Sequence, residues 1–436
     1  MSSFPDSPSG LVLTADLLHR WDNELADDDI AYVALYPGSP GPGPVHTVYV
    51  PVPRFDHDVI DRWRSAAVAA VEAMPGEWAG VLEGIAAAAG GEDPQVLHEL
   101  TLAKLADEPI EDLRIDLEDG FRAHRGPIDD ADEDRAAIRA AGIVASWADR
   151  PRSWGLRIRS LGGPTRHRGL RTLDLFLSHL GAPPGPGFVV TLPKVTSVAQ
   201  VTVFAEVLAL LENSYGPIHF EIQVETPQTL LGSDGRLPLP EMIRAGGGRV
   251  SGLHFGTYDY TASLGILGPY QDLRHPVADA AKDLMLLAAA ETGVRVSDGS
   301  DNKVPVGEPA TVARRWARHA DGVLRALWAG IYQGWDLHPA QLPTRFAATF
   351  AFYRTGFTDA VDRLERYHRQ DATGGVLDEP ATAFALARHL ASARACGAIT
   401  AGDIAPLSDA TIAYYLHRGA LPGGIEEGAD RASQPG

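Results

Sequence analysis

The chain has 436 residues, of which 45% are hydrophobic and 22% are charged, so it carries enough apolar material for a large packed core. Its formal net charge of −19 would repel nucleic acids and anionic membrane surfaces, so neither is expected as a partner. Cys396 is the only cysteine, which excludes an intrachain disulfide and a cysteine-based zinc site.

The N-terminal segment offers no targeting signal. Residues 1–10 are rich in serine and proline and lack the basic and apolar regions of a signal peptide. Further along the chain, no run of about 18 uninterrupted apolar residues occurs, so no membrane-spanning helix is predicted. We therefore expect a cytoplasmic protein. A glycine- and proline-rich loop at residues 37–44 then precedes the first predicted strand.

Strand-like and helix-like segments alternate between residues 45 and 345, the pattern of a parallel sheet with crossover helices. Eight strands are predicted, at residues 46–50, 113–117, 154–159, 188–192, 219–224, 250–255, 294–297 and 331–337. Amphipathic segments between them predict helices, for example at residues 130–147, 198–211, 277–292 and 311–320. Eight βα units over about 300 residues favour a closed (β/α)8 TIM barrel over an open doubly wound sheet.

The predicted barrel carries helical additions. After the first strand a helical insert of three helices is expected, at residues 57–74, 78–88 and 94–106. A helical C-terminal extension is expected from residues 346–370 and 380–396. The predicted organisation is therefore an N-terminal extension (1–44), a catalytic TIM barrel (45–345), a C-terminal helical extension (346–420) and a disordered tail (421–436).

Charged residues alternate with apolar residues in three predicted strands, so the charges share one face. The second strand carries Arg114, Asp116 and Glu118 on that face, and the third carries Arg157 and Arg159. The fifth strand repeats the pattern with its own set: Glu221, Gln223 and Glu225. Because the apolar face must meet the surrounding helices, these charges are predicted to point into the barrel.

Two interpretations of the inward charges stay open. Buried charges are costly unless they are paired or bind a cation. The first interpretation is a buried salt-bridge network of Arg114, Arg157, Asp116 and Glu221 that carries no chemistry. The second is an active site, which applies best at the C-terminal strand ends, where barrel enzymes place their catalytic groups.

A pair of carboxylates follows the fifth and sixth strands. Glu225 ends the fifth strand, and Asp259 lies about one βα unit further along, after the sixth. Both can therefore project over the same edge of the barrel. Two carboxylates completed by water and a substrate oxygen are a common way for proteins to hold Mg²⁺. The sequence thus predicts a magnesium site on Glu225 and Asp259.

Six ordered motifs resemble the HpcH/HpaI aldolase and citrate lyase β-subunit superfamily, and the chain is identified as a divergent member. They are residues 114–120 (RIDLEDG), 156–159 (LRIR), 192–194 (LPK), 224–230 (VETPQTL), 255–265 (FGTYDYTASLG) and 338–341 (HPAQ). Residues 46–54 (HTVYVPVPR) resemble the first strand of that family. The resemblance spans residues 45–345, nearly the whole predicted barrel.

The resemblance implies a Mg²⁺-dependent carbon–carbon lyase or aldolase that acts on a 2-oxo acid or 3-hydroxy acid through a metal-stabilised enolate. It implies metal ligation by Glu225 and Asp259, and it leaves open whether coenzyme A carries the substrate as an acyl-CoA. It also implies a homo-oligomer, a trimer or hexamer.

The same resemblance assigns roles to further side chains. Arg157 would grip the substrate carboxylate with its planar fork of donors. Glu118 and Asp119 would orient water around the metal, and Lys194 would serve catalysis at the end of the fourth strand. The remaining predicted substrate-binding residues are Arg159, Gly256 and Thr257.

Several positions depart from the family pattern. Arg159 stands where asparagine is usual, and it adds positive charge at the carboxylate end of the site. Tyr258 and Tyr260 flank Asp259, and His254 occupies a normally aliphatic strand position. We therefore predict a divergent branch whose substrate need not be that of a well-known member.

Some side chains have alternative roles. Lys194 could pair with Asp116 or Glu225 for structure alone, and His338 could simply cap the eighth strand. No general acid or base is assigned: candidates by position are His124, Asp378 and Asp403.

Two further features favour structural roles. Trp335 is expected to serve packing. Residues 246–248, a run of three glycines, predict a turn, because the run lacks the lysine of a phosphate-binding loop and precedes a strand.

Two rival functions remain. One is an aldolase that acts on free 2-oxo acids without any thioester. The other is a catalytically silent family member that acts as a binding or scaffolding subunit. Intact acidic ligands and a retained substrate arginine argue against the silent alternative, because an idle site has no reason to keep buried charges.

Overall fold

The computed structural model describes residues 12–122, 130–369, 379–405 and 407–418. At its centre, eight parallel strands pair in chain order and close into a barrel, which confirms the predicted (β/α)8 fold. The strands are β1 (His46–Pro51), β2 (Asp112–Asp116), β3 (Ser153–Arg157), β4 (Phe188–Leu192), β5 (His219–Val224), β6 (Val250–Phe255), β7 (Arg295–Ser300) and β8 (Gln333–Asp336). The predicted bounds of β4, β5 and β6 are confirmed, whereas β8 is shorter than predicted.

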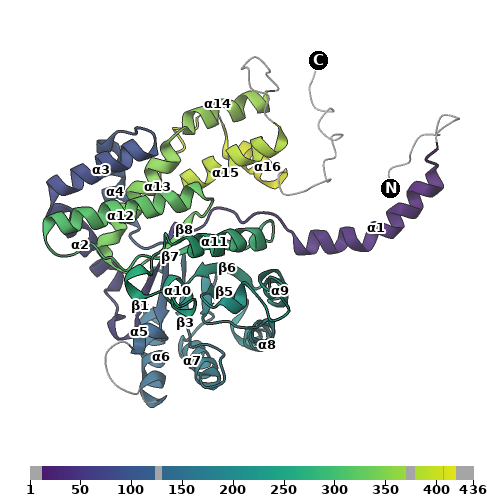
Figure 1. Cartoon of the computed structure of the whole chain (residues 1–436), viewed down its shortest axis with the longest axis horizontal. Helices are drawn as coiled ribbons and strands as arrows, with labels where there is room; N and C mark the ends of the chain where they lie inside the picture. The colour runs from purple at the N-terminus through teal and green to yellow at the C-terminus, as the bar shows by residue number, and fades with distance from the viewer. Residues whose placement is uncertain (1–11, 123–129, 370–378, 406, 419–436) are drawn as a thin grey trace.

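Helices follow the strands and form the outer layer of the barrel (Figure 1). They are α5 (Asp119–Arg122), α6 (Asp130–Ala145), α7 (Arg166–His179), α8 (Val198–Tyr215), α9 (Leu239–Ala245), α10 (Thr257–Ser263), α11 (Pro276–Ala289), α12 (Pro309–Trp328) and α13 (Leu342–Arg354). The four predicted crossover helices are confirmed. The predicted segment 311–320 covers only the N-terminal half of α12, which begins at Pro309 and continues to Trp328. This helix buries Trp316, Val323 and Leu327 along one face.

The predicted helical insert after the first strand is confirmed. It consists of α2 (Val59–Glu72), α3 (Pro75–Ala89) and α4 (Pro94–Asp107). Helices α3 and α4 pack against α12 and α13 on one side of the barrel (Figure 1). Trp78 of α3 meets Trp316 of α12 edge to face, with 5.5 Å between ring centroids. The insert therefore thickens the helical layer on one side of the barrel.

The C-terminal extension is helical, as predicted, but is divided differently. The prediction of one continuous helix at 346–370 is wrong. Gly356 adopts a φ of 72° and separates α13 from a second helix, α14 (Phe357–His368). Helix α15 has its predicted bounds (Pro380–Cys396), and α16 (Asp409–Arg418) was not predicted. The predicted tail, residues 421–436, lies outside the described residues.

An N-terminal helix that the sequence patterns did not indicate, α1 (Ala15–Leu35), projects from the barrel (Figure 1). None of its residues is buried within the chain.

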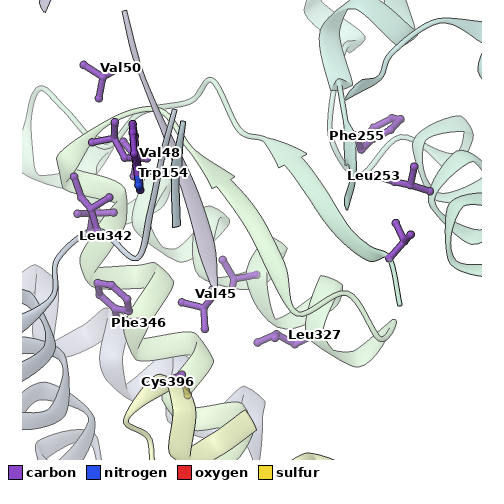
Figure 2. Packing of buried hydrophobic residues seen from close by; sticks show 14 of the residues in the cluster. Val45, Val48, Val50, Trp154, Leu253, Phe255, Leu327, Leu342, Phe346 and Cys396 are labelled. Carbon is purple, nitrogen blue, oxygen red and sulfur yellow. The ribbon is translucent and has the colours of Figure 1, made fainter. Parts of the chain in front are cut away.

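The hydrophobic core lies between the outer faces of the strands and the helices. Figure 2 shows this layer around Val48 and Val50 of β1, Leu253 of β6 and Phe346 of α13. Because apolar side chains occupy the outer faces, their alternate neighbours point into the barrel. Among the described residues, none of the helices combines the length and hydropathy that crossing a bilayer requires.

Candidate active site at the C-terminal rim of the barrel

The deep interior of the barrel holds a closed network of charges. Arg114 of β2 reaches Glu221 of β5, with 3.1 Å from Nε to Oε1 and 2.8 Å from Nη2 to Oε2. Asp112 binds the same guanidinium, and His254 lies 3.0 Å from Glu221. Burial acts to raise the pKa of Glu221, but Arg114 and His254 outweigh it and hold that pKa well below its usual range. This network matches the deeper part of the predicted salt-bridge alternative.

A second ion pair lies nearer the C-terminal strand ends. Arg157 binds Asp116 through two donors, Nε at 2.8 Å and Nη2 at 2.5 Å. The guanidinium stacks on two aromatic rings, 5.0 Å from the centroid of Tyr49 and 5.4 Å from that of Trp335. Only Nη1 is not bonded to Asp116, and it lies 3.4 Å from the side-chain oxygen of Gln223. Arg157 is therefore fixed in place by Asp116, and Nη1 is the nitrogen of its guanidinium that makes no hydrogen bond to that carboxylate.

Asp116 also explains the local geometry of the RIDLEDG motif. Its carboxylate accepts hydrogen bonds from the backbone N–H groups of Glu118 (3.0 Å) and Gly120 (2.9 Å). A Cβ on Gly120 would lie 2.3 Å from an oxygen of Asp116, so this position requires glycine. The turn places Glu118 and Asp119 at the edge of the barrel.

Lys194, which follows β4, joins acidic residues that follow three other strands, β2, β5 and β6. Its ammonium lies 2.5 Å from Glu118, 2.9 Å from Asp119 and 3.7 Å from Asp259. Its backbone N–H donates to Glu225 over 2.8 Å. Lys194 therefore contacts both predicted metal ligands and both predicted outer acids, rather than only one structural partner.

The backbone of Lys194 is unusual, with a φ of 52° in the left-handed region that favours glycine. Burial acts to lower the pKa of its ammonium, but Glu225, Glu118 and Asp119 outweigh burial and raise it. The side chain is thus a permanent cation held in a strained backbone conformation.

Glu225 is the buried acid of this group, with an exposed fraction of 1%. Its second oxygen accepts a hydrogen bond of 2.6 Å from the side-chain amide of Gln223. A Cβ on Gly256 would lie 2.4 Å from the Cβ of Glu225, so Gly256 makes room for this carboxylate. The pKa of Glu225 is raised to about 8, chiefly by burial. The carboxylates of Asp259 and Glu118 also act to raise this pKa, whereas Lys194 and Arg157 act to lower it.

We call Glu118, Asp119, Glu225 and Asp259 the acidic rim. Among the cations that the structure describes, Lys194 is the one that bonds chiefly to this group, because Arg157 is paired with Asp116. Among the described residues, no group of three or more His, Cys, Asp and Glu side chains is arranged to hold a metal. An ion here would rest on two carboxylates and complete its shell with water or substrate oxygens. This all-oxygen, acid-rich donor set fits Mg²⁺.

Two other predicted site residues have hydrogen-bond partners outside the acidic rim. Arg159 binds Glu133 of α6 at 2.6 Å and is buried in that pair. The hydroxyl of Thr257 faces the backbone carbonyl of Ser300, 3.5 Å away. Neither of these hydrogen bonds involves a carboxylate of the acidic rim.

The remaining candidates have local roles or cannot be placed. His338 caps the short helix η4 (Pro339–Gln341), accepting a hydrogen bond from the N–H of Ala340 (3.1 Å). Asp403 is exposed and accepts hydrogen bonds from Thr400. His124 and Asp378 lie outside the described residues.

Two aromatic residues of the site were not among the predicted site residues. Tyr49 donates to Glu221 over 3.0 Å, and its ring lies 4.1 Å from that of Trp335. The indole Nε1 of Trp335 is buried without a hydrogen-bond partner in the described part of the chain. Period-2 alternation places both residues on inward faces of β1 and β8, so the same pattern that found the charges could have found them.

Together, the closed parallel barrel and the acidic rim define a (β/α)8-barrel protein with a candidate cation site at the C-terminal strand ends. A family model described as Domain of unknown function (DUF6986) matches residues 25–418, so the chain belongs to this family. A comparison with curated proteins gives no significant match.

Solved structures share the fold. A citrate lyase from Burkholderia xenovorans LB400 is 21% identical, with a TM-score of 0.53 over 72% of this chain and 93% of that one. A citrate lyase beta subunit from M. tuberculosis, complexed with oxaloacetate and magnesium, is 19% identical over 71% and 97% of the two chains. A malate synthase from Haloferax volcanii is 13% identical over 81% and 88%. Their TM-scores of 0.40 and 0.46 are too low to bear on the function of this chain.

Proposed function

We propose that the chain is a Mg²⁺-dependent carbon–carbon lyase or aldolase that acts on a 2-oxo acid or a 3-hydroxy acid. The observation that carries this proposal is the excess of acid at the rim. Lys194 contacts all four carboxylates, three through its ammonium and Glu225 through its backbone N–H. The guanidinium of Arg157 lies 3.8 Å from one of them, Glu118. A divalent cation would balance that excess, and a carboxylate substrate would pair with Nη1 of Arg157, the nitrogen that Asp116 does not bind.

The residues would then divide the work. Glu225 and Asp259 would hold the ion, which when bound supplies Lewis acidity to an oxygen beside the substrate carboxylate. Arg157 would orient the carboxylate through Nη1. Lys194 would stay protonated, because its carboxylate neighbours raise its pKa, so it would act by its charge and not as a general base.

Magnesium titration by calorimetry tests the metal site. We expect the wild type to bind Mg²⁺, and Glu225→Gln and Asp259→Asn to bind it at least about tenfold more weakly. Asp234→Asn is the matched control, because Asp234 is an exposed acid whose contacts are with Arg236: a hydrogen bond of 3.0 Å from its backbone N–H and an ion pair of 3.8 Å. Equal Mg²⁺ affinity in all four proteins would contradict the proposed metal site. Full turnover in excess chelator would contradict the proposed metal-dependent chemistry.

A second candidate function, a catalytically silent binding subunit, is favoured by one observation. Asp116 already accepts hydrogen bonds from two nitrogens of Arg157. Arg157 therefore has fewer donors for a substrate than an unpaired guanidinium would have. Mg²⁺-dependent binding of pyruvate or oxalate, without turnover of any compound in a panel of 2-oxo acids, would support this alternative. Turnover of one member of the panel would exclude it.

Whether coenzyme A takes part in the reaction can be tested separately from the metal site. We expect an acyl-CoA enzyme to gain thermal stability with acetyl-CoA, and an enzyme of free 2-oxo acids to gain it only with pyruvate or glyoxylate. Each ligand is compared with and without Mg²⁺. The Asp259→Asn variant shows which of the shifts depend on the rim.

A further inference from the structure

The opposite end of the barrel contains a cavity of about 330 Å³ that no part of the proposed chemistry uses. It lies at the N-terminal ends of β7 and β8, under the loop that leads into β1. Two arginines line it, Arg295 at the start of β7 and Arg388 on α15. This end of the barrel is far from the acidic rim, because the rim residues follow the C-terminal ends of the strands.

Arg295 is poorly compensated. Its Nε is buried and has no hydrogen-bond partner among the described residues. Its Nη2 reaches only the backbone carbonyls of Gly41 and Pro42, at 3.5 Å each. Asp112 is the acid whose field acts on it, but Asp112 already binds Arg114 and accepts a 2.8 Å hydrogen bond from Thr47. Burial lowers the pKa of Arg295, as expected for a charge that lacks a counterion.

Arg388 is the second cation of this cavity and is half-buried. Its guanidinium lies 5.4 Å from the ring centroid of Tyr332, and no described carboxylate forms an ion pair with it. Glu291 is the one acid in the lining, and it is an exposed residue that accepts a hydrogen bond from Tyr32 at 3.0 Å. Within the described parts of the chain, both arginines therefore line the cavity without an ion pair to a carboxylate.

Other buried arginines of the chain, unlike Arg295 and Arg388, have carboxylate partners. Arg114, Arg157 and Arg159 each contact at least one carboxylate within 2.8 Å. Since a partly buried charge is costly without a partner, two such arginines beside one cavity point to an anion that comes from outside the chain. A larger adjoining cavity adds Arg244, which is exposed, and Arg152, which already pairs with Glu108 and Glu111. The smaller cavity is therefore the better defined site.

We propose that this cavity binds a small organic anion through Arg295 and Arg388. Planar guanidinium groups suit the oxygens of a carboxylate or a phosphate. The body of the ligand would lie against Tyr332 and the apolar side chains of Leu286 and Val296, which also line the cavity. The volume is in the range of small-molecule sites in proteins. The loop at residues 39–44 would close over the ligand, as its backbone already contacts Arg295.

Magnesium-free protein and three probes test the site: benzoate, phenyl phosphate and inorganic phosphate. We expect at least one probe to bind the wild type, and Arg295→Met and Arg388→Met to bind it at least about tenfold more weakly. Arg236→Met is the control, because Arg236 is an exposed arginine remote from the cavity, with a side-chain exposure of 88%. The preferred probe tells whether the natural ligand carries a carboxylate or a phosphate.

Two outcomes of this titration would overturn the proposal. One is the absence of binding for all three probes up to about 10 mM, and the other is unchanged binding in both cavity variants. Arg157→Met separates the two ends of the barrel. This variant should abolish carboxylate binding at the rim and leave binding at the cavity unchanged. A failure of the proposed rim site can therefore be distinguished from a failure of the proposed cavity site.

A second measurement needs no ligand. In buffer free of organic anions and phosphate, Arg295→Met should melt at the same temperature as the wild type or up to about 3 °C higher, because it removes an uncompensated charge and keeps most of the apolar stem. An added probe should then raise the melting temperature of the wild type only. A variant that melts below the wild type in anion-free buffer would show that the fold itself satisfies Arg295, and the proposal would be lost.

Discussion

Two layers of charge lie inside one barrel, and they are balanced differently. In the deep layer, Arg114 is enclosed by Asp112 and Glu221, so each charge has a partner and little of it meets water. At the acidic rim, four carboxylates share Lys194, and Glu225 keeps a pKa of about 8. The deep layer, whose charges are paired with one another, stabilises the fold and binds no ion. The acidic rim has an excess of negative charge, which a bound cation can balance.

The largest expected effect concerns the deep layer. Arg114→Met should leave Glu221 and Asp112 buried without their shared cation, and should lower the free energy of unfolding by about 3–5 kcal/mol. Urea denaturation measures this, with Arg236→Met as an exposed control. If Arg114→Met lost no more stability than the control, the charges of the deep layer would not stabilise the fold.

The next effect is a pH dependence of opposite sign in the two layers. Glu225 has a pKa raised from 4.5 to about 8, so the folded magnesium-free protein holds a proton that the unfolded chain has lost. Its contribution to stability therefore falls as pH rises from about 4.5 to about 8. Glu221 has a lowered pKa, so its contribution is lost as pH falls below about 4.5.

Melting temperatures of wild type and Glu225→Gln across this range measure the rim contribution. We expect the wild type to lose stability relative to the variant as pH rises towards 8, and Mg²⁺ to reverse the loss because it binds the ionised carboxylate. Parallel curves for the two proteins would mean that Glu225 titrates normally.

A smaller effect is expected where the rim is packed most closely. Gly256→Ala would place a Cβ 2.4 Å from the Cβ of Glu225 and 2.7 Å from its Oε2. We expect a loss of about 1–3 kcal/mol in unfolding free energy, together with weaker Mg²⁺ binding, as Glu225 is pushed aside. Gly268→Ala is the control, since a Cβ there would meet nothing within 4 Å. Equal behaviour of the two variants would show that Glu225 has room to move.

The smallest effect concerns the cation that already lies in the acidic rim. Lys194→Met removes a charge that would compete with Mg²⁺, and its backbone N–H can still hold Glu225. We expect Mg²⁺ affinity to rise by about 3–10-fold while turnover falls. Calorimetry and a 2-oxo acid assay on the same samples measure both. Weaker Mg²⁺ binding would instead show that Lys194 organises the ligands.

Much of the site could be read from the sequence, because strand periodicity is a local property. Alternation along β2 and β5 indicated which residues point inwards, and the βα spacing placed Glu225 and Asp259 at one edge. The same alternation applied to β1 and β8 would have included Tyr49 and Trp335. The role of Gly256 became visible only from its distance to Glu225.

The sequence by itself determined the barrel, its helical insert and the inward positions of the charges, since period and order along the chain are enough for these. The tertiary structure decided which charges meet. Arg114 and Glu221 are 107 residues apart, and Arg159 turned to Glu133 on a helix instead of facing the rim. Partner choice depends on where the closed barrel brings distant residues within a few ångströms, and no local pattern records that.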